Sequence, residues 1–435
     1  MYDIFSLPDI TFPDGFLWGS ATAGHQIEGD NIHSQKWEQE HADGWVLSGK
    51  ACDHYHRFRE DIDLLVRFGH QAFRMSIEWS RIEPEEGQWD EEAVAHYVQV
   101  LELLKESGIK VFLTLHHFTH PAWFERKGGF AAPENLPYFL RYVDFIVPRV
   151  FRYVDSWNVI NEFNKHGDRH DASFKFTMLR AHAGAFHRIK QYGDTPVSTA
   201  HAACSYVPFR FRDRGDNAMA DYLDFTSHEF FFHALRTGEL VYPFTDARFD
   251  PELKGAIDYW AINYYTRDLV DSRKAGGRGR FAHKTLRMID MDFYLEEMYP
   301  EGLITQLERV NDLPVYITEN GCCCNDDRFR IVYIALHLCA LKEAIDRGVD
   351  VRGYFYWSLL DNYEWGSFIP RFGLIDVDFE TFVRTPKPSA SLYRDIIRKN
   401  GVSRSMLHEY LSELPSLKNG KGNIRPETRP ATCRQ

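Results

Sequence analysis

Long apolar runs are missing from this chain of 435 residues, and so is the amino-terminal pattern of a secretory signal. No stretch of about 18 apolar residues occurs, which excludes a conventional transmembrane helix. Met1–Asp9 carries neither a positively charged start nor an apolar core of signal-peptide length. We therefore expect a soluble cytoplasmic protein that does not associate with a membrane.

Basic residues are scarce relative to acidic ones. The chain has 51 Lys and Arg against 63 Asp and Glu, which gives a net charge of −12. Nucleic-acid binding requires a basic surface, so this balance argues against it. A polyanionic ligand is disfavoured for the same reason.

Cysteines are also few, and three of the seven are consecutive at Cys322–Cys324. An odd count with this clustering does not suit a disulfide framework. Three adjacent thiols cannot readily close round one ion, so a zinc site is disfavoured too. We predict reduced cysteines without a specific role and no bound metal.

What the chain does contain is a regular alternation of short β-rich runs and longer helical patterns, which is typical of βα units around a parallel sheet. Eight candidate strands can be identified: Phe16–Ala21, Ala72–Ile77, Lys110–Leu115, Ser156–Ile160, Pro196–Ala200, Tyr259–Tyr264, Val315–Thr318 and Gly353–Ser358. The predicted fold is α/β, a single (β/α)8 TIM barrel over residues 1–402 with its active site at the carboxyl ends of the strands. Residues 403–435 are predicted to form a tail, partly packed on the surface or disordered.

Helices are predicted between these strands. Asp90–Ser107 and Ile331–Arg347 carry apolar residues at helical spacing, and Gly108 and Gly348 follow them as C-terminal caps. Arg267–Tyr299 does not fit the alternation, and we predict a long charged loop there, near the rim of the barrel.

Two glutamates, Glu162 and Glu319, each end a run rich in β-branched and aromatic residues. Because the carboxyl ends of barrel strands meet at one rim, the two can face each other although they are far apart in sequence. Hydrolysis of a glycosidic bond requires at least two carboxyl groups that face each other. A purely structural role is the alternative for each, since strand-end carboxylates often only pair with a polar neighbour.

Polar residues near these glutamates fit the same chemistry. Asn161 can hold a sugar hydroxyl beside Glu162, and Arg74 can pair with a rim carboxylate, lower its pKa and keep it ionised as a nucleophile. Of the consecutive His116 and His117 only one can face the barrel mouth, because successive strand residues point to opposite sides. A sugar contact by one of them is favoured over a metal site.

The last predicted strand leads into a segment, Tyr356–Trp365, that combines the indoles of Trp357 and Trp365 with the carboxylate of Glu364. Aromatic rings stack on the apolar face of a sugar, while carboxylates bind its hydroxyls. Packing alone explains this density poorly, so a sugar site is the better interpretation.

Taken together, these residues resemble glycoside hydrolase family 1, the β-glucosidase and β-galactosidase family, from about Phe12 to Asn400. The motifs that carry the resemblance are Phe12–Gly19, His25–Gly29, Phe73–Ile82, Thr114–Phe118, Asn161-Glu162, Asn263–Thr266 and Thr318–Gly321. Few families share so many separate motifs in this order.

The resemblance implies a retaining β-glycosidase, above all a β-glucosidase, that works without a cofactor. Glu319 is then the nucleophile that forms a covalent glycosyl-enzyme, and Glu162 is the acid that protonates the leaving oxygen and later the base for water. The resemblance also implies a set of substrate-binding residues, namely Gln26, His117, Asn161, Asn263, Tyr265, Trp357, Glu364, Trp365 and Phe372, with Arg74 in support.

Glu364 distinguishes substrates within the family, because 6-phospho-glycosidases carry a serine and a nearby lysine there. A carboxylate repels a phosphate. We therefore expect an unphosphorylated β-glucoside, or a related β-galactoside or β-fucoside, since Gln26, His117 and Glu364 could serve more than one of these sugars.

The chain also departs from the family pattern on the aglycone side. Phe163 stands where a proline is usual, and Asn164–Phe174 is shorter than the common form. Short rim loops predict an open aglycone side that accepts bulky or branched groups.

Three alternative functions remain open. A non-catalytic sugar-binding barrel would be favoured by loss of either glutamate, and both are present. A metal-dependent hydrolase is suggested by the twenty histidines, but paired His-X-His ligands at a first strand are missing. A transglycosylase would use the same covalent intermediate. A homo-oligomer is also compatible with a barrel of this size.

Overall fold

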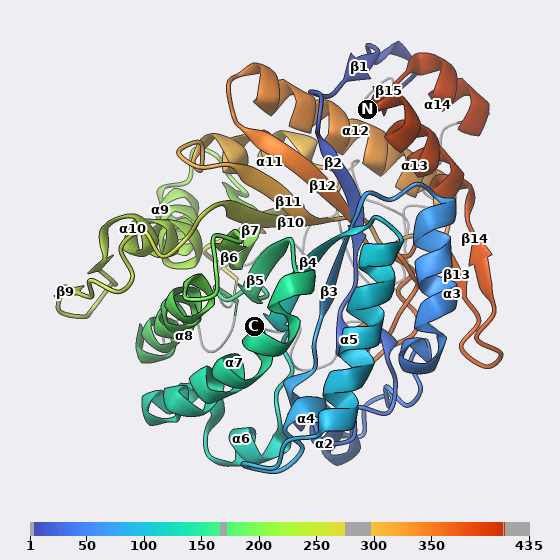
Figure 1. Cartoon of the computed structure of the whole chain (residues 1–435). Coiled ribbons are helices and arrows are strands. Elements are labelled where there is room, and N and C mark those ends of the chain that lie inside the picture. Colours follow the sequence, from blue (N-terminus) through green and yellow to red (C-terminus); the bar gives the residue numbers. More distant parts are fainter. Residues whose placement is uncertain (1–3, 166–171, 275–296, 412, 414–435) are drawn as a thin grey trace.

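The computed structural model describes residues 4–165, 172–274, 297–411 and 413. At its centre, nine parallel strands form a nearly closed barrel in the order β6-β5-β4-β3-β2-β12-β11-β10-β7 (Figure 1). The strands of the barrel are β2 Leu17–Ala21, β3 Ala72–Ser76, β4 Lys110–His116, β5 Ser156–Ile160, β6 Val197–Ser198, β7 Ala200–Pro208, β10 Trp260–Val270, β11 Val315–Asn320 and β12 Val351–Trp357. The predicted (β/α)8 fold is confirmed.

The fifth position of the barrel is split between two strands. β6 pairs with β5, and β7 pairs with β10, with only Thr199 between them. One predicted strand therefore occupies two places in the sheet and extends to Pro208, eight residues beyond its predicted end.

β10 likewise continues past its predicted end. Arg267–Val270 pairs in parallel with Ser205–Pro208 of β7, after a register shift that follows Tyr264. The prediction of a loop from Arg267 onward is wrong for these four residues, because each long strand supplies the backbone partners that the other needs. Most of the rest of the predicted loop, residues 275–296, lies outside the described residues.

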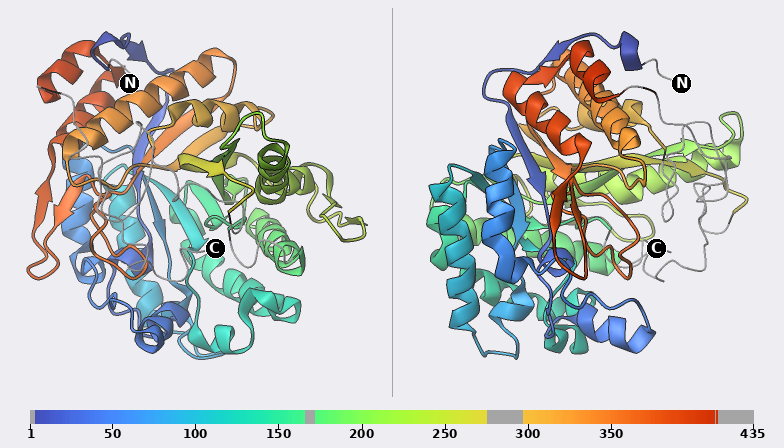
Figure 2. Two further views of the ribbon diagram at one scale, coloured as in Figure 1. Left: turned by 180° about the vertical axis from the view of Figure 1, so that it is seen from behind. Right: turned by 90° about the vertical axis from the view of Figure 1, so that its right-hand side faces the viewer.

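Helices surround the barrel on its outer side, as the views from front and back show (Figures 1 and 2). The longer helices are α2 Gln35–Asp43, α3 His54–Arg67, α5 Glu91–Glu106, α7 Leu136–Val150, α8 Ala172–Lys190, α9 Arg214–Asp224, α10 Phe230–Thr237, α11 Pro300–Glu308, α12 Asp327–Asp346 and α13 Pro388–Lys399. Shorter helical pieces are η1 Ile4–Ser6, α1 Gly24–Ile27, α4 Trp79–Ile82, α6 Ala122–Arg126, η2 Gly129–Ala131, η3 Pro133–Asn135, η4 Phe151–Tyr153 and the π-helix η5 Phe225–Glu229. None of the helices in the described part of the chain combines the length and apolarity needed to cross a membrane.

Local sequence explains where these helices begin and end. The Asp90 side chain caps α5 by accepting hydrogen bonds from the backbone N–H groups of Glu92 and Ala93 at 2.9 and 3.0 Å. Gly108 and Gly348 follow α5 and α12 with φ of 72° and 99°, the left-handed conformation that favours glycine. α12 begins four residues before its predicted start, where Asp326 accepts from the N–H of Arg328.

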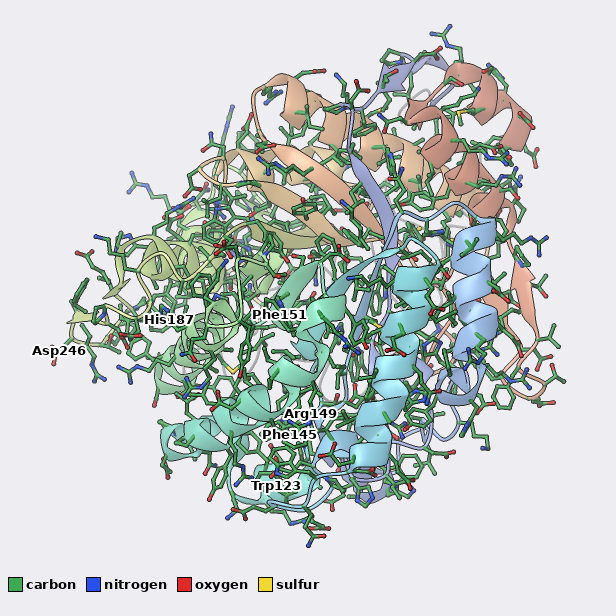
Figure 3. The ribbon with its side chains drawn as sticks, in the orientation of Figure 1. Trp123, Phe145, Arg149, Phe151, His187 and Asp246 are labelled. Carbon is green, nitrogen blue, oxygen red and sulfur yellow. The ribbon has the colours of Figure 1, made fainter. Side chains whose placement is uncertain are left out.

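Among the described residues, three two-stranded sheets lie outside the barrel. They pair β1 Ile10–Thr11 with β15 Gly401–Val402, β8 Glu239–Leu240 with β9 Arg248–Phe249, and β13 Ile375–Val377 with β14 Arg384–Pro386. The first brings the two ends of the barrel domain side by side (Figure 2). The second projects from the body of the molecule, with Asp246 in its loop at the left edge of Figure 3.

A further helix, α14 Arg404–Tyr410, occupies part of the predicted tail. Ser403 caps it, and Met406 and Leu407 are buried. The ring of His408 stacks on Phe5 with centroids 4.7 Å apart. These residues therefore belong to the packed body, whereas residues 412 and 414–435 lie outside the described residues.

Apolar side chains fill the inside of the barrel as well as the space between strands and helices. Four aromatic residues pack together: Phe112 of β4, Tyr316 of β11, Phe355 of β12, and Tyr259, which directly precedes β10. Ring centroids lie 4.6 Å apart for Phe112 and Phe355, and 5.2 Å apart for Tyr259 and Tyr316. This aromatic layer lies inside the barrel, beneath the polar residues of the rim.

Candidate active site

Glu162 and Glu319 both lie at the carboxyl ends of barrel strands, and both are buried. Glu162 follows β5 after one residue, and Glu319 is the last residue but one of β11. Asn263 of β10 lies between them: its Nδ2 is 3.4 Å from Glu162 Oε1, and its Oδ1 accepts a 2.7 Å hydrogen bond from Thr318. The two carboxyls therefore belong to one polar group at the rim.

Both carboxylate oxygens of Glu319 have hydrogen-bond donors. The guanidinium of Arg74, fully buried on β3, donates to Oε1, and the phenol of Tyr265 donates to Oε2 at 2.6 Å. Burial raises the pKa of Glu319; Arg74 and Tyr265 lower it, while the charge of Glu162 raises it further. Arg74 thus pairs with a rim carboxylate and acts to lower its pKa, as predicted, but burial outweighs the ion pair and the net direction is upward.

Arg74 also orients Asn161. Its Nη2 donates to Asn161 Oδ1 at 2.6 Å, and the Asn161 Nδ2 lies 3.1 Å from Nε2 of His117. The neighbouring His116 turns away from this group and packs against Phe130, with ring centroids 5.2 Å apart. Of the two histidines, His117 is thus the one beside the carboxyls.

Aromatic rings and a carboxylate line the group on the side of β12. Trp357 stacks on His117 with centroids 5.8 Å apart, and its indole Nε1 lies 3.3 Å from Glu364 Oε1. Trp365 stacks on His117 as well, at 6.4 Å. This places a flat apolar surface beside a buried acceptor, which suits a sugar ring and its hydroxyls.

Gln26 and Phe372 complete the set of predicted residues. The Nε2 of Gln26 donates to Asn362 Oδ1 at 3.0 Å and to the Tyr363 carbonyl at 2.9 Å, directly before Glu364. Its Oε1 is buried without a hydrogen-bond partner among the described residues, so this acceptor is free for a ligand hydroxyl. Phe372 packs edge-on against Tyr265 at 6.1 Å. Every residue predicted for the site is therefore joined to the same constellation.

Some residues of the constellation were not predicted. Lys165 places its ammonium 3.0 Å from Glu162 Oε2, and its position three residues after Glu162 was an available signal. His25 stacks on Trp365 at 5.9 Å and lies 2.9 Å from Glu40 Oε1. No local pattern indicates the contact between His25 and Trp365, because it joins residues more than 300 positions apart.

The backbone is strained at three loops of this rim. Phe118, Glu162 and Trp365 adopt positive φ angles of 63°, 48° and 46°. Non-glycine residues rarely occupy this region, and such strain gathers at functional sites, where the surrounding structure enforces it.

The three consecutive cysteines lie in the same apolar cluster as Trp357 and Phe372. All three are buried, and the sulfurs of Cys322 and Cys324 are 4.0 Å apart. Within the part of the chain that the structure describes, no group of three or more His, Cys, Asp or Glu is arranged to hold a metal ion.

The sequence and the fold of this chain are similar to those of known proteins. The model of the glycosyl hydrolase family 1 matches residues 9–402. The chain belongs to this family. It is 31% identical to "Beta-glucosidase A" of Thermotoga maritima over 90% of this chain and 98% of that protein. Among solved structures, the beta-glycosidase from Pyrococcus horikoshii matches with a TM-score of 0.83 and 33% identity, over 92% of this chain and 98% of that one.

Relatives with a different substrate also occur within the family. A protein of Streptococcus equi subsp. zooepidemicus named "6-phospho-beta-galactosidase" is 30% identical to this chain, over 90% of the chain and 99% of that protein. Membership of the family therefore leaves the phosphorylation state of the sugar to be decided by the residues of the site.

Proposed function

We propose that this protein is a retaining β-glycosidase that hydrolyses unphosphorylated β-D-glucosides, with Glu319 as nucleophile and Glu162 as acid and base. Membership of glycosyl hydrolase family 1 supports hydrolysis of O-glycosyl bonds, and the relatives named as beta-glucosidases support a glucoside. The single observation that carries the assignment of roles is the difference between the surroundings of the two carboxyls.

Glu319 has a permanent cation on one oxygen and a phenol on the other. These donors hold the carboxylate as an anion in a fixed direction, which is what attack on an anomeric carbon needs. Departure of the aglycone then leaves the sugar covalently bound to Glu319.

Within the part of the chain that the structure describes, no buried cation contacts Glu162. Its partners among the described residues are the Asn263 amide and the largely exposed ammonium of Lys165. A carboxyl with these looser contacts can lose a proton to the leaving oxygen in the first step and take one from water in the second. The two carboxyls supply both the covalent and the proton-transfer chemistry, so the proposed reaction uses no cofactor.

Glu364 supports the choice of an unphosphorylated sugar. Its carboxylate is buried and close to the indole N–H of Trp357. A phosphate placed beside a buried carboxylate meets strong repulsion, whereas sugar hydroxyls can donate to the carboxylate.

We also propose a cytoplasmic location, which follows from the sequence prediction.

A panel of nitrophenyl β-glycosides tests this function, with proton NMR of the first product formed. We expect turnover of the β-glucoside with release of the β-anomer, and a loss of at least about 1,000-fold in kcat for Glu319→Gln, which preserves the shape of the side chain. An α-anomeric product, or a Glu319→Gln variant as active as the wild type, would contradict the proposal. Binding of the glucoside without any turnover would indicate a non-catalytic barrel.

A further inference from the structure

Glu162 depends on its backbone for its position. With φ of 48° it occupies the left-handed region, where a non-glycine residue is strained by roughly 1 kcal/mol or more. Among the described residues its carboxyl has one long contact, to Asn263 at 3.4 Å, and one contact to Lys165, a side chain that is 59% exposed. Neither contact fixes a carboxyl firmly, because the first is long and the second is screened by water.

The turn that carries Glu162 is closed by its own backbone. The N–H of Lys165 donates to the Glu162 carbonyl at 2.8 Å, and the N–H of Phe163 donates to the carbonyl of Ala200 at 3.4 Å. The ring of Phe163 is buried against Phe231, with centroids 4.8 Å apart. Phe163 lacks the ring constraint of a proline, so it does not fix its own φ.

Asn164 ties this turn to two other elements. Its Nδ2 donates to the carbonyls of Ala202 and Ser227, both at 3.0 Å, and its Oδ1 accepts from the N–H of Ala202 at 2.9 Å. Ala202 lies on β7, and Ser227 lies in the π-helix η5, an irregularity of the kind often found at functional sites. Asn164 is 6% exposed, so these bonds are shielded from water.

The geometry points to Asn164 as a positioning residue for Glu162. By fixing the turn against β7 and η5, its amide sets the direction in which the Glu162 carboxyl meets the glycosidic oxygen. This inference rests on the proposed function, in which Glu162 transfers a proton in both half-reactions. Loss of the amide turns the Glu162 carboxyl away, while Glu319 stays in place because Arg74 and Tyr265 hold it.

Leaving groups of different acidity separate this role from a merely structural one. Dinitrophenolate departs without a proton, whereas phenolate needs one from the general acid. For Asn164→Ala we expect kcat/KM to fall roughly 30- to 100-fold with phenyl β-glucoside and about threefold or less with 2,4-dinitrophenyl β-glucoside. Azide needs no general base, so we expect it to raise kcat of the variant, but not of the wild type, with the dinitrophenyl substrate.

Asn135→Ala is the matched control. Asn135 is a buried asparagine whose Nδ2 donates to the carbonyls of Lys127 and Gly129, neither of which belongs to the site. We expect it to lower Tm without changing the dependence on the leaving group. Asn164→Ser, which removes less of the side chain's polarity, gives the same comparison if Asn164→Ala does not fold.

The outcomes distinguish this inference from the function on which it rests. An equal loss with all leaving groups, or no loss at all, would overturn the role of Asn164. A wild-type protein that cleaves neither aryl glucoside would instead overturn the proposed function.

Discussion

The phenol of Tyr265 donates a 2.6 Å hydrogen bond to Oε2 of Glu319, the oxygen that Arg74 leaves unoccupied. This bond lowers the pKa of Glu319, whereas burial raises it and dominates. In Tyr265→Phe the pKa of Glu319 therefore rises further. Because the nucleophile must be ionised, we expect the acidic limb of the kcat/KM profile to move to higher pH, and kcat to fall by roughly 10- to 100-fold. A profile with an unchanged acidic limb would contradict this.

Replacement of Arg74 is expected to harm stability as well as activity. Arg74→Met leaves the buried Glu319 carboxylate without its cation, and breaking a buried pair in this way costs about 3–5 kcal/mol. Urea unfolding measures the loss. The control is Arg352→Met, which breaks an exposed pair with Asp350 and is expected to change the free energy of unfolding by about 1 kcal/mol or less.

Substitution of Glu364 tests the preference for an unphosphorylated sugar. We expect the wild type to cleave nitrophenyl β-glucoside at least about 100-fold faster, as kcat/KM, than its 6-phosphate, because the carboxylate repels the phosphate. Glu364→Ser removes that repulsion together with an acceptor for sugar hydroxyls. We therefore expect kcat/KM to rise for the 6-phosphate and to fall for the unphosphorylated glucoside, so that the ratio between them decreases. A wild type that prefers the 6-phosphate would show that another residue sets the preference.

An ion pair remote from the site predicts a pH dependence of stability. Asp61 of α3 accepts from Arg384 of β14 at 2.9 Å and lies 2.8 Å from the His54 ring. Burial acts to raise the pKa of Asp61, but the hydrogen bonds from His54 and Arg384 outweigh it, so the net pKa is lowered. A carboxyl with a lowered folded-state pKa stabilises the protein above its unfolded pKa of about 3.9, and that stability is lost as the pH falls through the folded value.

Asp61→Asn removes this linkage. We expect it to cost about 3 kcal/mol at pH 7, and the difference in Tm between wild type and variant to shrink below about pH 4. Thermal unfolding at a series of pH values measures both. A constant difference across the series would mean that ionisation of Asp61 does not contribute.

The short connection after Glu162 predicts tolerance on the aglycone side. We expect kcat/KM for a bulky glycosylated natural product to lie within about tenfold of that for a small aryl glucoside, since few contacts would exclude it. Parallel assays of the two substrates measure this. Activity on the small substrate alone would contradict the prediction, which concerns Asn164–Phe174, a segment that includes residues 166–171 outside the described part of the chain.

The barrel could be predicted from sequence because its strands, buried on both faces, are short runs of apolar and β-branched residues between helices of clear periodicity. The continuation of β7 to Pro208 and of β10 to Val270 could not. Each extension exists because the other strand lies beside it, and neither segment alone carries that information.

A site residue could be predicted where one short motif identifies both the residue type and its place at the end of a strand, as at Asn161-Glu162. It was not predictable where effects depend on burial. The pKa of Glu319 follows from the dry surroundings of the rim as much as from Arg74. The stacking of His25 on Trp365 depends on how the short helix α1 meets a loop that is distant in sequence.

Within the part of the chain that the structure describes, the aromatic layer of Phe112, Tyr259, Tyr316 and Phe355 fills the barrel beneath the rim, so the substrate of the proposed reaction reaches the two glutamates from the rim side. With the lower end of the barrel filled by these rings, a glucoside enters sugar first, and the aglycone is the last part to enter and the first to leave. Water must then arrive by the route that the aglycone has vacated. An alcohol bound on that route competes directly with water. The partition between hydrolysis and glycosyl transfer therefore depends on which of the two occupies the vacated aglycone position.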